Sequence, residues 1–240
     1  MEKNLMNTAE VIAVTLPVGK IAHINVDEFI AYVARVSNPN NQNNTKTAPK
    51  LIKYLLDNSH VSPLDMANVV MEINTTRDIA RQVLRHSSAK FQEFSQRYQN
   101  VSELGFTIRE ARLQDTKNRQ NSIETNDDDL QSQWRLWQED VIHVSKQAYE
   151  WALKNGIALE QARVVLPEGL TMSRMYMSAT IRTWIFYLAV RLHRATQKEH
   201  RELAYSAYQE LLKHFPSLHE SMLKMYHDEL EALGYLDDVD

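Results

Sequence analysis

The sequence predicts a helix-rich α+β fold with one modest, mostly antiparallel sheet. Long stretches in the second half repeat apolar residues at helical spacing, whereas short runs near residues 9–18 and 68–73 are β-branched or alternating. Only 5 of the 240 residues are glycine, and no glycine-rich phosphate loop occurs, which excludes Rossmann and P-loop folds. We expect a single domain over residues 1–240.

The first half is predicted to alternate strands and helices. We expect a strand at 9–18, helices at 26–36 and 48–56, a helical turn within 60–65 and a strand at 68–73. Thr75 and Thr76 offer an N-cap for a helix over 77–86. Arg85 would then stand at the end of this helix, before an irregular loop that carries binding residues.

The second half is predicted to be mainly helical. A strand at 106–109 is followed by a polar, mobile insertion at about 114–129. A long helix over 130–154 is expected to end at Asn155 and Gly156 and to bury an apolar stripe of Trp134, Trp137, Val141, Val144, Ala148 and Trp151. A short helix at 159–166, a partial strand at 170–179, an apolar helix at 181–192 in the core or at a subunit interface, and helices at 197–215 and 218–233 complete the chain.

The composition excludes several function classes. The net charge of −4, from 27 basic and 31 acidic residues, provides no positive field for nucleic acid or an anionic membrane. The absence of cysteine excludes a thiolate nucleophile and cysteine-ligated metals. We expect no metal site, because the four histidines from His193 to His219 lack metal-ligand spacing. Without an export signal or an apolar run of about 18 residues, a cytoplasmic location is expected.

Residues 85–98 hold the densest group of candidate binding residues. They combine two arginines, a histidine, a glutamate and amides directly after an apolar run. Burying a neutral polar group without a partner costs roughly 2–7 kcal/mol, so a core segment has no use for these side chains. A bound anion with a polar ring would satisfy them, which predicts a ligand site here.

Four segments, taken in order, carry a resemblance to a known family. They are Gln82-x-x-Arg85-His86, Glu93-x-Ser95-x-Arg97-Tyr98, Ala162-Arg163-x-x-Leu166-Pro167 and an apolar helix that ends in Arg191. This order resembles the flavin-dependent thymidylate synthases over about residues 62–199. The resemblance implies that dUMP is methylated to dTMP with methylenetetrahydrofolate as cosubstrate and with reducing equivalents from NADPH through FAD. It also implies a homotetramer with shared active sites.

The resemblance further implies roles for individual residues. Substrate binding is assigned to Gln82, Arg85, Glu93, Phe94, Ser95, Gln96, Arg97, Arg163 and Arg191. Guanidinium groups bind phosphate bidentately, and the charge of Arg191 would stabilise the negative charge that develops as uracil C5 becomes nucleophilic. Arg191 is therefore the predicted catalytic residue. Cofactor binding is assigned to Ser62, Arg85, His86, Ser87 and Glu93.

The cofactor half departs from the family pattern. The motif Arg-His-Arg-x-x-Ser reads Arg85-His86-Ser87-x-x-Lys90 here, while Thr180, Phe186 and Ala195 replace two asparagines and a histidine. Two alternatives to dTMP synthesis therefore stay open. One is a dUMP 5-hydroxymethylase that uses methylenetetrahydrofolate and water without net reduction, and the other is a non-catalytic nucleotide-binding protein.

Overall fold

The computed structural model describes residues 7–236, which form two compact units. Unit 1 comprises the chain up to Thr8, Ile73–Arg85 and Gln92–Met175. Unit 2 comprises Ala9–Glu72, His86–Phe91 and the chain from Tyr176 onward. The segment predicted to bind ligand therefore leaves unit 1 after Arg85 and re-enters it at Gln92. A single domain over residues 1–240 stays a prediction.

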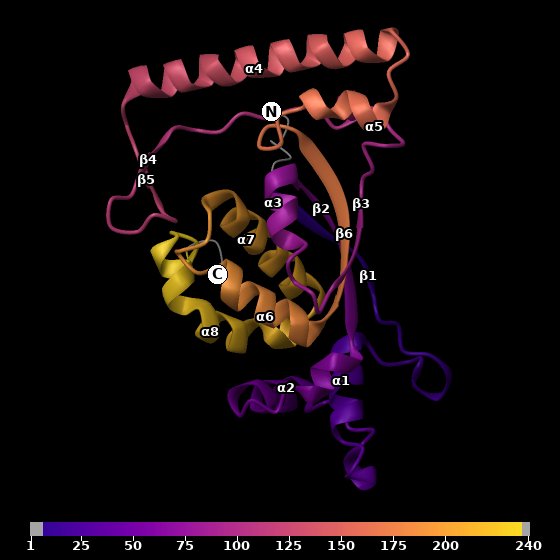
Figure 1. The fold of residues 1–240 in the computed structure, drawn as a ribbon. Coiled ribbons are helices and arrows are strands. Elements are labelled where there is room, and N and C mark those ends of the chain that lie inside the picture. The colour runs from indigo at the N-terminus through magenta and orange to yellow at the C-terminus, as the bar shows by residue number, and fades with distance from the viewer. Residues whose placement is uncertain (1–6, 237–240) are drawn as a thin grey trace. The chain divides into compact units, whose positions relative to one another are not determined.

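A four-stranded sheet has the strand order β1-β2-β6-β3, and Figure 1 labels its strands. Its strands are β1 (Thr8–Val14), β2 (Asn68–Thr76), β3 (Lys90–Glu93) and β6 (Met172–Thr180). β2 and β6 alternate buried with more exposed residues, because successive side chains of a strand point to opposite faces. This small antiparallel sheet in a helix-rich chain confirms the predicted α+β class.

Unit 1 contains α3 (Arg77–Val83), the long α4 (Asp128–Lys154) and the short α5 (Leu159–Ala162). Asp127 caps α4, since its carboxylate accepts the N–H of Leu130 at 3.0 Å. The helix ends at Asn155 and Gly156 as predicted, with the glycine at a φ of 77° that suits this residue after a helix. An apolar cluster of Val101, Tyr149, Ala152 and Ala162 joins α4 to α5, which lies beside one end of the long helix in Figure 1.

Unit 2 contains α1 (Val26–Ala34), α2 (Ala48–Asp57), α6 (Ile181–Arg191), α7 (Lys198–His214) and α8 (His219–Ala232). Asn25 and Glu28 form a capping box at the start of α1. α6 packs against α7 and α8, and the buried indole of Trp184 donates to the carbonyl of Val69 at 3.3 Å. Within residues 7–236, no helix combines the length and apolar character needed to cross a bilayer.

Most of the predicted helices form, but α3 is shorter than expected. It ends at Val83 rather than at residue 86, so Arg85 lies in the turn that follows. Thr76 occupies the N-cap position without capping the helix, because its hydroxyl donates to the Asp78 carboxylate at 2.5 Å. Asp78 in turn binds both terminal nitrogens of Arg109, at 2.8 and 2.7 Å. This ion pair anchors the start of α3 in unit 1.

Three other expectations about unit 1 were wrong or incomplete. The strand at 106–109 does not form, since Phe106 makes an isolated bridge to Thr171. The polar stretch at 114–129 is partly ordered as a hairpin of β4 (Arg112–Gln114) and β5 (Ser122–Glu124). The stripe of α4 that was predicted to be buried is largely exposed, and a different face of the helix packs inward.

The apolar helix of unit 2 was predicted to lie in the core or at a subunit interface, and part of it is buried within the chain. α6 buries Trp184, Tyr187 and Leu188, but Phe186 is exposed. Part of the apolar surface of this helix is therefore not covered by the rest of the chain. Hydrophobic periodicity identifies a helix but does not show which apolar face is covered within one chain.

Candidate functional site

A cavity of about 400 Å³ lies within unit 1, where it is lined by residues of α3, of α5, of the turn after β3 and of the chain that follows α5. Its lining residues are Arg77, Arg81, Gln96, Glu160, Gln161, Arg163, Val164, Leu166 and Glu168. The size is in the range of small-molecule sites, roughly 300–1,000 Å³. Three guanidinium groups face two carboxylates here, which makes the cavity suited to an anion. Of the predicted site residues, Gln96 and Arg163 line it.

Glu93 holds the two arginines of α3. Its carboxylate lies 3.6 Å from Arg77 Nη1 and 3.5 Å from Arg81 Nη1, and it accepts a hydrogen bond from Ser173 Oγ at 3.0 Å. Burial lowers the pKa of the Arg77 guanidinium, an effect that the charge of Glu93 opposes. Glu93, which the sequence predicted as a site residue, therefore fixes the cationic wall of the cavity.

Gln96 and Arg163 have hydrogen-bond donors to which the structure assigns no partner among the described residues. The Gln96 side chain is 4% exposed, and its Nε2 has no acceptor among the described residues. Within the same part of the chain, Arg163 forms no ion pair, and its Nε donates to the carbonyl of Glu160 at 3.2 Å. An unsatisfied buried polar group costs about 1–3 kcal/mol. This corner of the cavity therefore suits a ligand that supplies acceptor oxygen atoms.

The neighbours of Gln96 in sequence shape the turn that holds it. The N–H of Phe94 donates to the carbonyl of Arg174 at 2.8 Å, which ties the end of β3 to β6. Ser95 then starts a turn, and its carbonyl accepts the N–H of Tyr98 at 3.1 Å. Arg97 is exposed and lies 3.5 Å from Glu160.

Gln82 and Arg85 do not line this cavity. Gln82 is half-buried in the last turn of α3, and Arg85 is exposed in the turn that follows. Their predicted role in nucleotide binding stays a prediction. Arg77 and Arg81 were missed because they lie outside the recognised motif, although their spacing of four residues on a helix places them on one face.

In unit 2, Arg191 and His86 form a direct contact. Arg191 ends α6, and its Nε donates to His86 Nε2 at 2.8 Å. Burial, followed by the charge of Arg191, lowers the pKa of His86 to about 4. The imidazole is therefore neutral near pH 7, with a lone pair on Nε2 for the arginine and the proton on Nδ1.

Tyr187 packs against His86 and in turn contacts His200. The rings of His86 and Tyr187 meet edge to face with centroids 4.8 Å apart. The Tyr187 hydroxyl lies 3.1 Å from His200 Nε2 in a fully buried position. Burial raises the pKa of Tyr187 and lowers the pKa of His200 to about 3. Near pH 7, His86, Tyr187 and His200, which lie next to the Arg191 guanidinium or behind its histidine partner, are therefore uncharged.

The buried histidines predict a loss of stability in mild acid. Their pKa values in the folded state, about 4 and about 3, lie below the ordinary 6.5, so the unfolded chain takes up protons first as the pH falls. We expect the melting temperature to fall between about pH 6.5 and 4, and to fall less steeply in His200→Gln, which keeps a partner for Tyr187. Circular dichroism melts from pH 7 to 4 measure the slope. The exposed His227→Gln is the control, and an unchanged slope in His200→Gln contradicts the prediction.

Besides His86, the predicted cofactor residues of unit 2 are Ser62 and Ser87, whose hydroxyl groups can donate hydrogen bonds, and Lys90 lies near them in the sequence. Ser62 is exposed at the start of a 3-10 turn, Ser87 is exposed in the turn after α3, and Lys90 is exposed at the start of β3. None of these residues lines the cavity of about 480 Å³ beside α1 and α2, whose own lining includes Lys50, amides and hydroxyls. Its Arg35 donates to Thr47 Oγ1 at 2.7 Å and to the Asn44 carbonyl. Donors of this kind fit a phosphate-bearing group.

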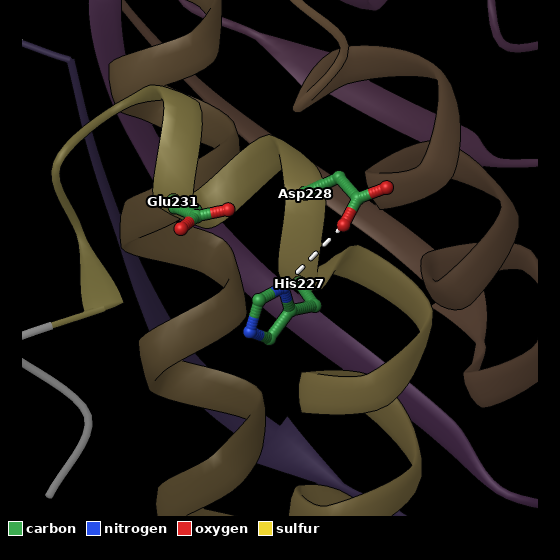
Figure 2. A group of neighbouring side chains, drawn as sticks. All are labelled: His227, Asp228 and Glu231. Carbon is green, nitrogen blue, oxygen red and sulfur yellow. Dashed lines mark hydrogen bonds and ion pairs between the residues drawn. The ribbon is translucent and has the colours of Figure 1, made fainter.

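Three side chains of α8 approach a metal-binding arrangement. One ligand atom each from His227, Asp228 and Glu231 lies within 4.8 Å of the others. Figure 2 shows the His227 ring beside the Asp228 carboxylate, with Nδ1 and Oδ1 3.4 Å apart. All three side chains are exposed, and such groups are common without a metal. They do not define a metal site.

The cavity of unit 1 combines guanidinium and amide donors, a lining that is suited to a small anionic ligand. The chain belongs to the family described as thymidylate synthase complementing proteins, Thy1, whose family model matches residues 21–217. This confirms the resemblance that the four sequence segments indicated.

Similar proteins cover nearly the whole chain. A probable flavin-dependent thymidylate synthase of Paramecium bursaria Chlorella virus 1 is 46% identical over 216 residues, which is 90% of this chain and 98% of the relative. A flavin-dependent thymidylate synthase of Synechocystis is 45% identical over 81% of this chain and 88% of its own length. The crystal structure of the UMP/dUMP methylase PolB from Streptomyces cacaoi, bound with 5-Br dUMP, matches with a TM-score of 0.76 at 25% identity. It covers 90% of this chain and 94% of the methylase.

Proposed function

We propose that this protein methylates C5 of dUMP to form dTMP, with methylenetetrahydrofolate as carbon donor and FAD and NADPH for the reduction. The relatives named flavin-dependent thymidylate synthase and the solved dUMP methylase support this activity. The observation that carries the proposal is the pair of unused donors, Arg163 and the Gln96 amide, in the anion-suited cavity of unit 1.

Arg163 binds the nucleotide phosphate in this proposal. A guanidinium offers paired N–H donors that match phosphate oxygen atoms, and no carboxylate among the described residues competes for this one. The Gln96 amide donates to a second acceptor of the same ligand. Arg77 and Arg81 add positive charge, held in position by Glu93.

Arg191 supplies the catalytic charge. His86 is neutral near pH 7 and accepts a hydrogen bond from Arg191 Nε, and this contact orients the guanidinium group. A fixed cation at the uracil ring stabilises the negative charge that develops as C5 becomes nucleophilic. His86 is thereby a positioning residue for Arg191.

FAD supplies reducing equivalents from NADPH when it is bound. Ser62, His86 and Ser87 of unit 2 would hold it through their hydroxyl and imidazole donors, with Lys90 adding a charge. Arg85 and Glu93 of unit 1 are also retained as predicted cofactor residues. A homotetramer and a cytoplasmic location complete the proposal.

Product analysis tests the function directly. The purified protein is incubated with dUMP and methylenetetrahydrofolate, with and without FAD and NADPH, and the nucleotide is analysed by mass spectrometry. We expect dTMP, and only when the reductant is present. A 5-hydroxymethyl product formed without the reductant would support the alternative that Ser87 and Lys90 favour. Recovery of unmodified dUMP from protein that binds it would indicate a non-catalytic nucleotide-binding protein.

A further inference from the structure

Tyr187 and His200 form a hydrogen-bonded pair in the interior of unit 2, next to the contact between Arg191 and His86. Both side chains are 0% exposed, and the Tyr187 hydroxyl lies 3.1 Å from His200 Nε2. A buried polar pair contributes little more to stability than two well-packed apolar side chains of the same shape, since both polar groups lose their water on folding. The stability of the core alone therefore does not account for a tyrosine and a histidine here.

The contacts fix where the protons of this group lie. Arg191 Nε always carries a hydrogen atom, so His86 Nε2 accepts the bond with its lone pair, and the imidazole proton is on Nδ1. The Tyr187 hydroxyl donates to His200 Nε2, because this hydroxyl has no other partner among the described residues and the reverse direction would leave its buried proton unpaired. Both histidines are therefore acceptors at Nε2, and the direction of each lone pair depends on the orientation of its ring.

Tyr187 connects these two hydrogen bonds through its ring. It lies four residues before Arg191 on α6, a spacing that places both side chains on one face of the helix. Its ring meets His86 edge to face with centroids 4.8 Å apart, and it meets Trp184 in the same manner at 5.6 Å. Aromatic pairs prefer this geometry. Two ring contacts and the hydroxyl bond thus hold the Tyr187 ring, against which His86 packs.

His200 comes from a different helix, α7, which packs against α6. The chain between the two helices is short and is held by its own hydrogen bonds. The Thr196 hydroxyl donates to the Val190 carbonyl at 3.1 Å. Arg201 Nη1 donates to the Arg194 carbonyl, also at 3.1 Å. The acceptor of the tyrosine hydroxyl, in the first turn of α7, is therefore fixed relative to the end of α6.

We propose that Tyr187 and His200 are positioning residues, which orient the guanidinium of Arg191 through the ring of His86. The inference rests on the proposed function, in which the charge of Arg191 stabilises a negative charge that develops on the uracil ring. Such a group is effective when its orientation is fixed before the reaction, and a displacement of about 1 Å can cost about a hundredfold in rate. Tyr187 and His200 are buried and do not line the cavity of unit 1. Their loss should therefore lower kcat and leave the affinity for dUMP unchanged.

Two substitutions at His200 test the positioning role by turnover. We expect His200→Leu to lower kcat about 10- to 100-fold, because it removes the acceptor of the Tyr187 hydroxyl. His200→Gln should retain most of the wild-type kcat, because its side-chain oxygen can take the place of Nε2 as acceptor. Rapid-quench kinetics and isothermal titration calorimetry separate kcat from the dissociation constant of dUMP. An equal loss of kcat in both variants, or a parallel loss of dUMP affinity, overturns the proposal.

A double variant tests whether the two residues act through one bond. Tyr187→Phe keeps the ring that packs against His86 and removes the hydroxyl. Combined with His200→Leu, it should lower kcat no further than His200→Leu alone, since both changes remove the same interaction. Tyr208→Phe is the matched control with wild-type kcat, because Tyr208 is also 0% exposed in unit 2 and its hydroxyl has no partner among the described residues. Additive losses in the double variant, or a loss in Tyr208→Phe as large as that in Tyr187→Phe, overturn the proposal.

Crystal structures of the wild type and of His200→Leu test the positioning without turnover. We expect the contact of 2.8 Å between Arg191 Nε and His86 Nε2 in the wild type and its loss in the variant. An unchanged contact in the variant overturns the inference and leaves the proposed function in place. Loss of the contact in a protein whose wild type forms no dTMP would support the positioning of Arg191 and reject the proposed function.

Discussion

Replacing Arg163 with alanine is expected to weaken dUMP binding by about 10- to 100-fold. A charge-assisted hydrogen bond contributes about 1.5–3 kcal/mol, and 1.4 kcal/mol corresponds to a factor of ten in affinity. The side chain lines the cavity of unit 1 and forms no ion pair among the described residues, so its removal breaks no internal salt bridge there. Isothermal titration calorimetry with dUMP measures the change.

The control for this experiment is Arg135→Ala in the same unit. Arg135 is exposed on α4, pairs with Glu139 at 2.8 Å and does not line the cavity. The Arg135→Ala variant therefore loses the same positive charge without changing the cavity lining. Its affinity for dUMP should match the wild type. Equal affinities for the Arg163 and Arg135 variants would remove Arg163 from the nucleotide site.

Replacing Arg191 with alanine is expected to lower kcat by at least about 100-fold, the scale for loss of one fixed group that stabilises a developing charge. Binding of dUMP should fall by less, because the proposed phosphate contacts lie on other residues. Rapid-quench turnover and calorimetry on the same preparation separate the two effects.

Arg182→Ala provides the matched control on the same helix. Arg182 is an exposed arginine of α6 that pairs with Asp65 at 2.9 Å, and an exposed pair contributes about 0–1 kcal/mol to stability. Its turnover should remain close to wild type. Unchanged turnover in the Arg191 variant would exclude this residue from the mechanism.

The sequence predicted the fold class and two residues that line the candidate cavity, for identifiable reasons. Periodicity locates α4 and α6, and capping residues such as Asp127 locate a helix start. Motif resemblance found Arg163 and Gln96, which line the cavity. It did not find Arg77 and Arg81, because their importance arises from Glu93, a residue on a different element that holds them.

Other features depend on tertiary structure that local patterns do not encode. Arg85 and His86 are neighbours in sequence, but they belong to different compact units. Thr76 is a residue type that often caps helices, yet its hydroxyl donates to Asp78 instead. Asp78 also pairs with Arg109, which is 31 residues further along the chain. The apolar stripe of α4 was predicted to be buried, but a helical pattern does not show which apolar face is covered within one chain.

The ion pairs of Glu93 also bear on which ligands the cavity selects. Arg77 and Arg81 both pair with Glu93, and Arg81 also pairs with Glu168 at 3.3 Å. An incoming group must therefore compete with these carboxylates for the two arginines, whereas Arg163 forms no ion pair among the described residues. A doubly charged phosphate monoester competes well, because its attraction to the guanidinium groups grows with its charge. An uncharged nucleoside offers no such competition. If the cavity is the nucleotide site, we therefore expect Glu93 to make binding of the phosphorylated form of a ligand stronger than binding of the same ligand without its phosphate.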